Sequence, residues 1–188
     1  EIPDNIWYDE ALQTAEFLKN INIKKVNIIG TSGGALVGIN CALLCPERIN
    51  RVIADSFEGE HALDIIAETI DKERKNSKSD NDMVRFWKEN HGEDWEVVVD
   101  MDTKALIKHY KNMKNFFPGK LSELKVPVLL TGSLEDEYAE YISFEENYKK
   151  MLEKIPEGKM HLFKKGGHPA FITAGSDFFQ TAKEFFTK

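Results

Sequence analysis

The sequence lacks several features that would place it in well-defined classes of protein. None of its hydrophobic runs approaches the roughly 18 residues that a transmembrane helix needs. Positive charge is not in excess, because 25 Lys and Arg face 32 Asp and Glu, which gives a formal net charge of -7 at pH 7. An acidic chain offers no electrostatic footprint for nucleic acid and is repelled by anionic membrane surfaces. We therefore expect neither nucleic acid nor a membrane as a partner.

Cysteine is scarce, with only Cys41 and Cys45 in 188 residues. The two lie four residues apart within a predicted apolar helix, which favours reduced thiols in a hydrophobic core. No other Cys or His lies near them in the sequence, so the spacing does not favour a metal site. The sequence therefore predicts a cytoplasmic protein with no metal and no other cofactor.

What the sequence does contain is an alternation of strand and helix patterns. Short apolar runs typical of buried parallel strands occur at residues 25–29, 51–56, 126–131 and, more weakly, 159–163. Apolar residues at helical spacing occupy residues 10–20, 35–43, 143–154 and the stretch that follows Ser176. Ser143 and Ser176 are the predicted N-caps of the last two helices. Strands that alternate with helices predict an α/β fold with a mainly parallel sheet flanked by helices.

The segment 58–124 interrupts this alternation. It contains no clear strand and is predicted to form helices at about residues 62–74, 82–90 and 103–113. The charged stretch "KERKNSKSDND", residues 72–82, is predicted to be a solvated loop. We predict a helical cap, residues 58–124, inserted between two parts of a core, residues 1–57 and 125–188. Aromatic residues of the insertion would either line an apolar pocket or form the core of the cap: Phe86, Trp87, Trp95, Phe116 and Phe117.

A glycine-rich turn follows the first predicted strand and carries one central hydroxyl. The stretch is "NIIGTSGGALVG", and its Gly30-x-Ser32-x-Gly34 pattern between a strand and a helix is typical of a nucleophile elbow. Such a turn strains the serine backbone and leaves no room for side chains at the flanking positions. The N–H of Gly33, at the start of the helix, would donate to an oxyanion. The alternative is a phosphate-binding turn, but the chain has neither a P-loop lysine nor a G-x-G-x-x-G motif.

A nucleophilic serine needs a base, and five histidines are available. His168 is the best candidate because it directly follows the last predicted strand, behind two glycines in "GGHPAF". His161 lies inside that strand and is expected to be structural. The others fall in the predicted insertion: His61, His91 and His109.

The base in turn needs a carboxylate that orients it. The loop "TGSLEDEY" after the third strand offers three, Glu135, Asp136 and Glu137. Asp55, at the end of the second strand, is the alternative acid.

The order Ser32, Asp136, His168 along the chain resembles that of the α/β-hydrolase superfamily. The resemblance rests on "NIIGTSGGA", "VPVLLTGSLEDEY" and "GGHPAF", extends from about residue 8 to the C-terminus, and is strongest to small esterase-like members with a helical cap. It implies that Ser32 attacks a carbonyl carbon, that His168 accepts the serine proton, and that water then cleaves the acyl-enzyme. The family's acid position fits Glu135 and Asp136, and we prefer Asp136 because a shorter acid is usual there. The resemblance thus implies a carboxylesterase-like serine hydrolase, although thioesterases, lactonases, acyltransferases and peptidases share the pattern.

The chain departs from this family at its start, which looks like the helix before the elbow strand. The family's first strands are then missing, together with the loop that donates the second oxyanion hydrogen bond. We expect a partial hydrolase core whose elbow strand is an exposed sheet edge. Such an edge predicts either a homodimer formed through it or a piece of a longer hydrolase. The absent donor also leaves open a catalytically impaired fragment or a binding module.

Overall fold

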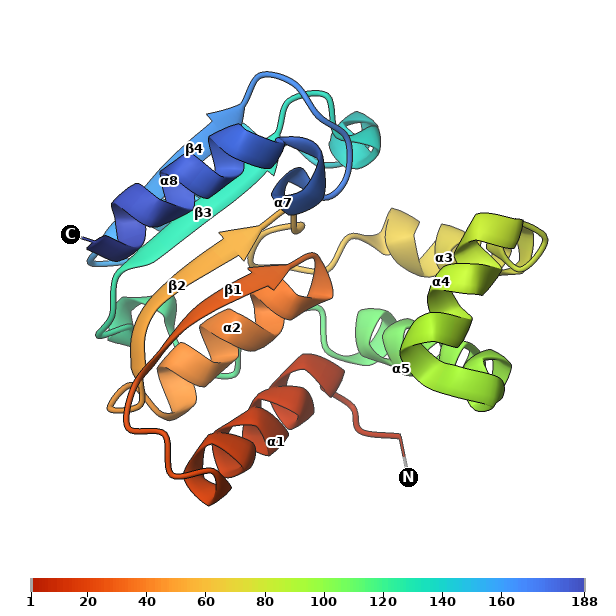
Figure 1. Cartoon of the computed structure of the whole chain (residues 1–188), viewed down its shortest axis with the longest axis horizontal. Coiled ribbons are helices and arrows are strands. Elements are labelled where there is room, and N and C mark those ends of the chain that lie inside the picture. The colour runs from red at the N-terminus through yellow and green to blue at the C-terminus, as the bar shows by residue number, and fades with distance from the viewer. Residues whose placement is uncertain (1, 188) are drawn as a thin grey trace. The chain divides into compact units, whose positions relative to one another are not determined.

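The sheet consists of four parallel strands in the order β1-β2-β3-β4 (Figure 1). The strands are β1 (Val26–Thr31), β2 (Ile49–Asp55), β3 (Val128–Ser133) and β4 (Gly158–Phe163). A computed structural model describes residues 2–187 of the chain. Because neighbouring strands run in the same direction, all four end at the same edge of the sheet. The residues that follow the strands therefore gather at this carboxyl edge.

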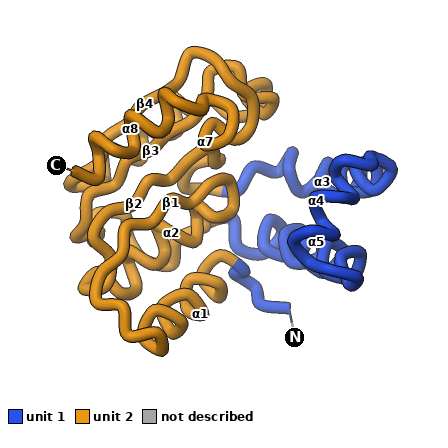
Figure 2. The backbone as a smooth tube through the Cα atoms, viewed as in Figure 1, with its two compact units in different colours: residues 1–6, 62–114 blue, residues 7–61, 115–188 orange. Residues whose placement is uncertain are grey.

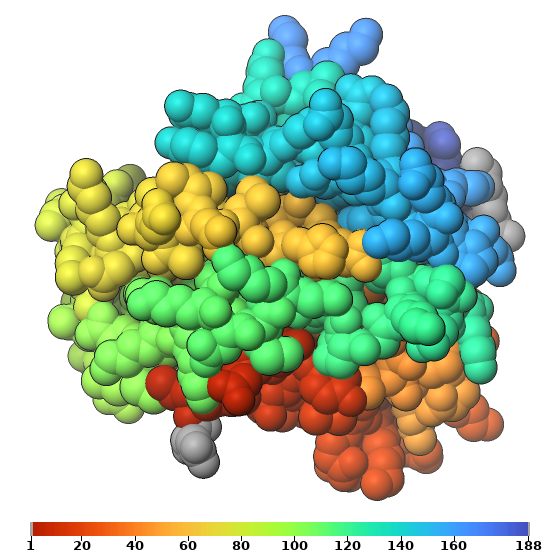
Figure 3. Space-filling model, turned by 180° about the vertical axis from the view of Figure 1, so that it is seen from behind, coloured from red at the N-terminus to blue at the C-terminus, as the bar shows by residue number. Residues whose placement is uncertain are grey.

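Helices cover both faces of the sheet, as a parallel sheet requires. They are α1 (Ile6–Asn20), α2 (Gly33–Leu44), α6 (Phe144–Leu152), the short α7 (Ala170–Thr173) and α8 (Gly175–Thr187). α8 lies across β3 and β4 in Figure 1, and its Phe178 and Phe185 share a hydrophobic cluster with Leu129 and Phe163 of those strands. α2 packs against β1 and β2, and α6 comes into view from the opposite side in Figure 3. The sheet therefore has helices on both sides, which is the predicted α/β arrangement.

The two cysteines are buried and unpaired at the C-terminal end of α2. Burial raises the pKa of the Cys41 thiol to about 12, so this group stays protonated and unreactive at neutral pH. The cytoplasmic location that these thiols suggested stays a prediction. Within residues 2–187, the helices lack the combination of length and apolar character that crossing a bilayer requires.

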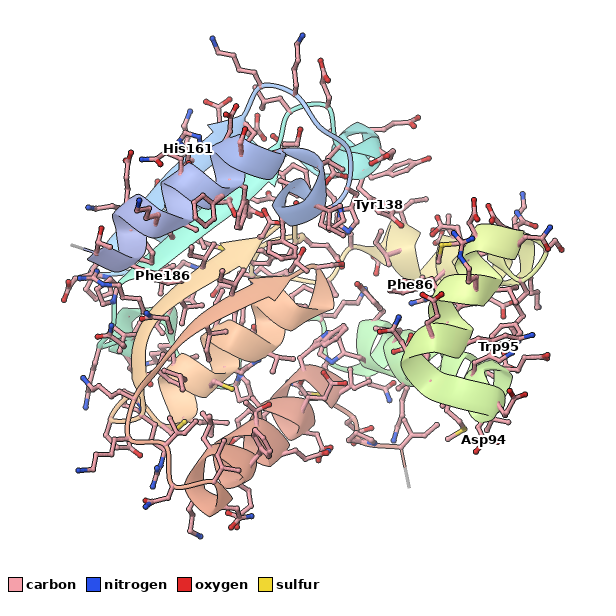
Figure 4. The ribbon with its side chains drawn as sticks, in the orientation of Figure 1. Phe86, Asp94, Trp95, Tyr138, His161 and Phe186 are labelled. Atoms are coloured by element: carbon pink, nitrogen blue, oxygen red, sulfur yellow. The ribbon has the colours of Figure 1, made fainter. Side chains whose placement is uncertain are left out.

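A second compact unit contains Ala62–Lys114 together with the residues up to Ile6 (Figure 2). Its helices are α3 (Asp64–Ser77), α4 (Asn81–His91) and α5 (Trp95–Asn112). The indole rings of Trp87 and Trp95 stack with their centroids 5.6 Å apart and form a small core with Val99. Figure 4 shows Trp95 at the start of α5. Of the two roles considered for these tryptophans, the structure therefore supports the core of the helical segment.

Two predictions for this segment were wrong in their boundaries. The stretch 72–82 is largely helical, because α3 continues to Ser77 and α4 begins at Asn81. An exposed ion pair between Lys75 and Asp71, one turn earlier, adds a small stabilisation to this part of α3. The last helix of the segment begins at Trp95 rather than near residue 103. The compact unit covers Ala62–Lys114 of the predicted insertion of 58–124, and both the insertion and its role as a cap stay predictions.

Of the two predicted helix caps in the sheet-containing unit, Ser143 is confirmed in position and Ser176 is wrong. Ser143 stands at the N-cap of α6 but its side chain makes no capping hydrogen bond. Ser176 lies within α8, which begins at Gly175. The short helix α7 was not predicted, since its four residues are too few to show a periodic pattern.

The edge position of β1 leads to a prediction about association. Among the described residues β1 pairs only with β2, and Ile29 on it is 42% exposed. An apolar strand edge of this kind favours pairing with another chain, so we expect the 188-residue chain to form a homodimer of twice its 21.5 kDa. Light scattering measures the mass, and Ile29→Lys, which puts a charge on the edge, should return the protein to monomers. A monodisperse monomer without that substitution would contradict the prediction.

Candidate active site

The backbone at Ser32 forms the sharp turn that joins β1 to α2. Its φ of 52° and ψ of -124° lie in a region that non-glycine residues rarely adopt. Gly30 allows the turn, because a Cβ on this residue would lie 2.0 Å from the carbonyl oxygen of Gly34. The Ser32 side chain is exposed at the carboxyl edge of the sheet. Local sequence thus builds a strained turn that presents a hydroxyl, as the glycine pattern predicted.

The two glycines after Ser32 differ in what they make room for. A Cβ on Gly33 would lie 2.4 Å from the ring of Trp7 on α1, so this tryptophan packs directly against the turn. A Cβ on Gly34 would meet no atom within 4 Å among the described residues. The sequence predicted that side chains at Gly30 and at Gly34 would clash with their surroundings. This prediction holds for Gly30 and is wrong for Gly34. Gly33 opens α2, and the N–H groups of a first helical turn have no partner within the helix.

His168 and Asp136 meet at the same edge of the sheet. His168 Nδ1 lies 2.9 Å from Asp136 Oδ2. The Asp136 side chain is fully buried, and its other oxygen accepts a hydrogen bond from the N–H of Tyr138 at 2.9 Å. The His168 ring stands edge-on to the ring of Tyr138, with centroids 4.9 Å apart, and Tyr138 is marked in Figure 4. The imidazole is therefore held by a buried carboxylate on one side and an aromatic ring on another.

The three neighbouring acids have different roles. Glu135 is exposed, whereas Asp136 is buried against His168. Glu137 accepts a hydrogen bond from the backbone N–H of His168 at 2.5 Å. Asp136 thus binds the ring and Glu137 binds the backbone of the same residue.

Asp55, the alternative acid, binds other partners than His168. Its Oδ2 accepts hydrogen bonds from the hydroxyl of Thr31 at 3.1 Å and from the N–H of Phe171 at 2.8 Å. Its Oδ1 accepts a hydrogen bond from the hydroxyl of Thr131 at 2.7 Å. Burial raises the pKa of the Asp55 carboxyl, and these hydrogen bonds partly offset that rise. Asp55 is therefore a fully buried carboxylate at the centre of the carboxyl edge.

Ser32 and His168 are not hydrogen-bonded to each other in the part of the chain that the structure describes. Hydrogen bonds between a nucleophile and its base are often long before a substrate binds. The structure therefore brings acid and base into contact and places the serine at the same edge of the sheet, at the end of β1, with β2 between β1 and β3.

The remaining histidines have other surroundings. The ring of His161, on β4, packs edge-on against Phe163 with centroids 4.7 Å apart. His109 is buried in α5, and burial lowers the pKa of its imidazole. His91 ends α4, and His61 precedes α3, where it forms an isolated bridge with Asn115.

Sequence reasoning missed several residues that shape this edge. They are Trp7, which packs on Gly33; Ser133, which hydrogen-bonds the Gly166 carbonyl; and Ser56, which accepts a hydrogen bond from the Ala170 N–H at 2.9 Å. Each of these contacts joins residues far apart in the chain, so no local pattern could reveal them.

The chain was compared with models of protein families, with curated proteins and with solved structures. No model of a protein family and no curated protein matches the chain. Among solved structures, a carboxylesterase of the thaumarchaeon Nitrososphaera gargenis matches with a TM-score of 0.70 and 15% identity over 96% of this chain and 71% of its own. A serine hydrolase involved in carbazole degradation matches with a TM-score of 0.69 and 19% identity, over 100% of this chain and 73% of its own. An esterase from Exiguobacterium antarcticum matches with a TM-score of 0.66 and 16% identity, over 99% of this chain and 76% of its own. Part of each solved chain thus has no counterpart here, which fits the expected absence of some strands.

Proposed function

We propose that this chain, whose fold is that of the α/β-hydrolases, is a serine hydrolase that cleaves carboxylic esters through an acyl-enzyme on Ser32. The observation that carries the proposal is the 2.9 Å contact between His168 Nδ1 and the buried carboxylate of Asp136. This pair lies at the same sheet edge as the strained turn of Ser32. A serine, a histidine and a carboxylate at the ends of different parallel strands are the components that acyl transfer requires.

The proposed reaction assigns one task to each residue. Ser32 Oγ attacks the ester carbonyl carbon while His168 Nε2 takes the hydroxyl proton. Asp136 holds the ring through Nδ1 and stabilises the imidazolium. The N–H of Gly33 donates to the oxyanion of the tetrahedral intermediate. His168 then passes the proton to the leaving alcohol, and a water molecule activated by the same imidazole hydrolyses the acyl-enzyme.

The described roles of the solved structures support an ester as the substrate class. Two of them are described as a carboxylesterase and an esterase, and a third as a serine hydrolase. A panel of p-nitrophenyl esters from acetate to decanoate tests this choice and measures the preferred acyl length.

Substitution of Asp136 separates the proposed acid from its neighbour. We expect Asp136→Asn to lower kcat for p-nitrophenyl acetate by about 10²–10⁴-fold, because the amide no longer stabilises the imidazolium or selects the correct tautomer. The exposed Glu135 offers a matched control, and Glu135→Gln should leave kcat unchanged. A larger loss in Glu135→Gln than in Asp136→Asn would assign the acid to Glu135 and contradict the proposal.

A further inference from the structure

We propose that Asp55 is a positioning residue that sets the spacing between the Ser32 turn and the His168 loop. The inference rests on the proposed function, because it concerns the same serine and histidine. It assigns to Asp55 a role different from that of the acid that orients the histidine.

A single oxygen of Asp55 connects the two halves of the site. Oδ2 accepts a hydrogen bond from the hydroxyl of Thr31, the residue directly before Ser32, at 3.1 Å. The same oxygen accepts a hydrogen bond from the N–H of Phe171, three residues after His168, at 2.8 Å. One carboxylate oxygen therefore connects the strand end that carries the serine with the segment that follows the histidine.

The backbone around Asp55 strengthens both connections. Its carbonyl oxygen accepts a hydrogen bond from the N–H of Ser32 at 2.8 Å. The next residue, Ser56, has a φ of 52° and accepts a hydrogen bond from the N–H of Ala170 through Oγ at 2.9 Å. The end of β2 thus binds the Ser32 turn and the segment after His168 through side chain and main chain together.

The carboxylate itself is held in one orientation. Asp55 is 0% exposed, and its other oxygen, Oδ1, accepts a hydrogen bond from Thr131 on β3 at 2.7 Å. A buried polar group whose hydrogen bonds are all made is costly to displace. Asp55 therefore links the register of β1, β2 and β3 to the segment after His168, in addition to the hydrogen bond that Ser56 accepts from Ala170. Since small misplacements of catalytic groups cost about 10²-fold in rate, this position matters for the proposed reaction.

The hydrogen-bond pattern predicts how two substitutions at Asp55 will differ. Asparagine keeps an oxygen that accepts from Thr31 and Phe171, and its amide group can donate to Thr131. Alanine removes all three bonds. We expect Asp55→Ala to lower kcat by about 10²-fold with KM nearly unchanged, because the loss falls on the alignment of reacting groups. Asp55→Asn should retain most of the wild-type kcat. A loss in Asp55→Asn as large as in Asp136→Asn would mean that the charge of Asp55 is needed, and would overturn the inference.

Hydrogen exchange measured by mass spectrometry tests the same inference without catalysis. In Asp55→Ala we expect peptides that cover residues 165–174 to exchange at least about tenfold faster, while peptides from α2 and β3 keep their protection. Unchanged exchange over residues 165–174 would overturn the inference whether or not the protein hydrolyses esters. Faster exchange in a protein that turns over no ester would uphold the connection between loop and turn and would instead contradict the proposed function.

A milder variant covers the case in which Asp55→Ala fails to fold. Thr31→Val removes one hydroxyl and leaves the bond between Asp55 and Phe171 in place. One lost hydrogen bond corresponds to about a fivefold fall in kcat. Thr187→Val, at the end of α8, removes an exposed hydroxyl of the same kind and is the matched control. Equal kcat values for the two variants would contradict the inference.

Discussion

Replacing Ser32 with alanine should reduce the hydrolysis of p-nitrophenyl acetate by about 10⁴–10⁶-fold. The reason is that Ser32 is the proposed nucleophile, and no acyl-enzyme forms without its hydroxyl. The fold should be unaffected, because the Ser32 side chain is exposed and makes no capping hydrogen bond to α2. The measurement is the steady-state rate of the wild-type protein and of Ser32→Ala at equal concentration.

Active-site labelling identifies the nucleophile directly. A fluorophosphonate probe should modify the wild-type protein at Ser32 and should not modify Ser32→Ala. Ser143→Ala is the matched control, because Ser143 is also exposed and its side chain makes no capping hydrogen bond. If Ser32→Ala retains wild-type turnover, or if the probe modifies another residue, Ser32 is not the nucleophile. If the wild-type protein neither hydrolyses the ester nor reacts with the probe, the chain is better described as a binding module.

Gly30→Ala should prevent folding or lower the free energy of unfolding by more than about 3 kcal/mol. A Cβ at this position would lie 2.0 Å from the oxygen and 2.5 Å from the carbonyl carbon of Gly34. Both atoms belong to the backbone of the first turn of α2, which cannot move away without breaking its contact with β1. Urea unfolding followed by circular dichroism measures the change.

Gly34→Ala is the matched control, because it adds the same methyl group four residues later. A Cβ on Gly34 would meet no described atom within 4 Å, and the residue lies in the first turn of α2. Alanine is favoured over glycine in helices by up to about 1 kcal/mol, so we expect stability to be unchanged or slightly raised. Equal effects of the two substitutions would show that the turn does not have the backbone geometry described above.

Local sequence patterns account for the strands and for the turn at Ser32. Each of the four strands was predicted to within two residues of its observed bounds, because a strand buried in a parallel sheet needs a short uninterrupted apolar run. The strained backbone of Ser32 was expected from the Gly30-x-Ser32-x-Gly34 pattern between a strand and a helix, and the clash that excludes a side chain at Gly30 arises within five residues. Helix boundaries were less well predicted, as the extension of α3 to Ser77 shows, because they depend on side-chain pairing and on packing within the unit.

Tertiary structure decided which of the candidate groups contact one another. The sequence offered Asp55, Glu135, Asp136 and Glu137 as acids, and the structure sets Asp136 against the ring of His168 and Glu137 against its backbone. It also shows that Asp55, a candidate acid in the sequence, binds Thr31 and Phe171, which is 116 positions further along the chain in α7. The physical reason is that parallel strands bring their carboxyl ends to one edge whatever their separation in sequence. The side chain that reaches a given partner there depends on strand register and loop conformation, which no local pattern encodes.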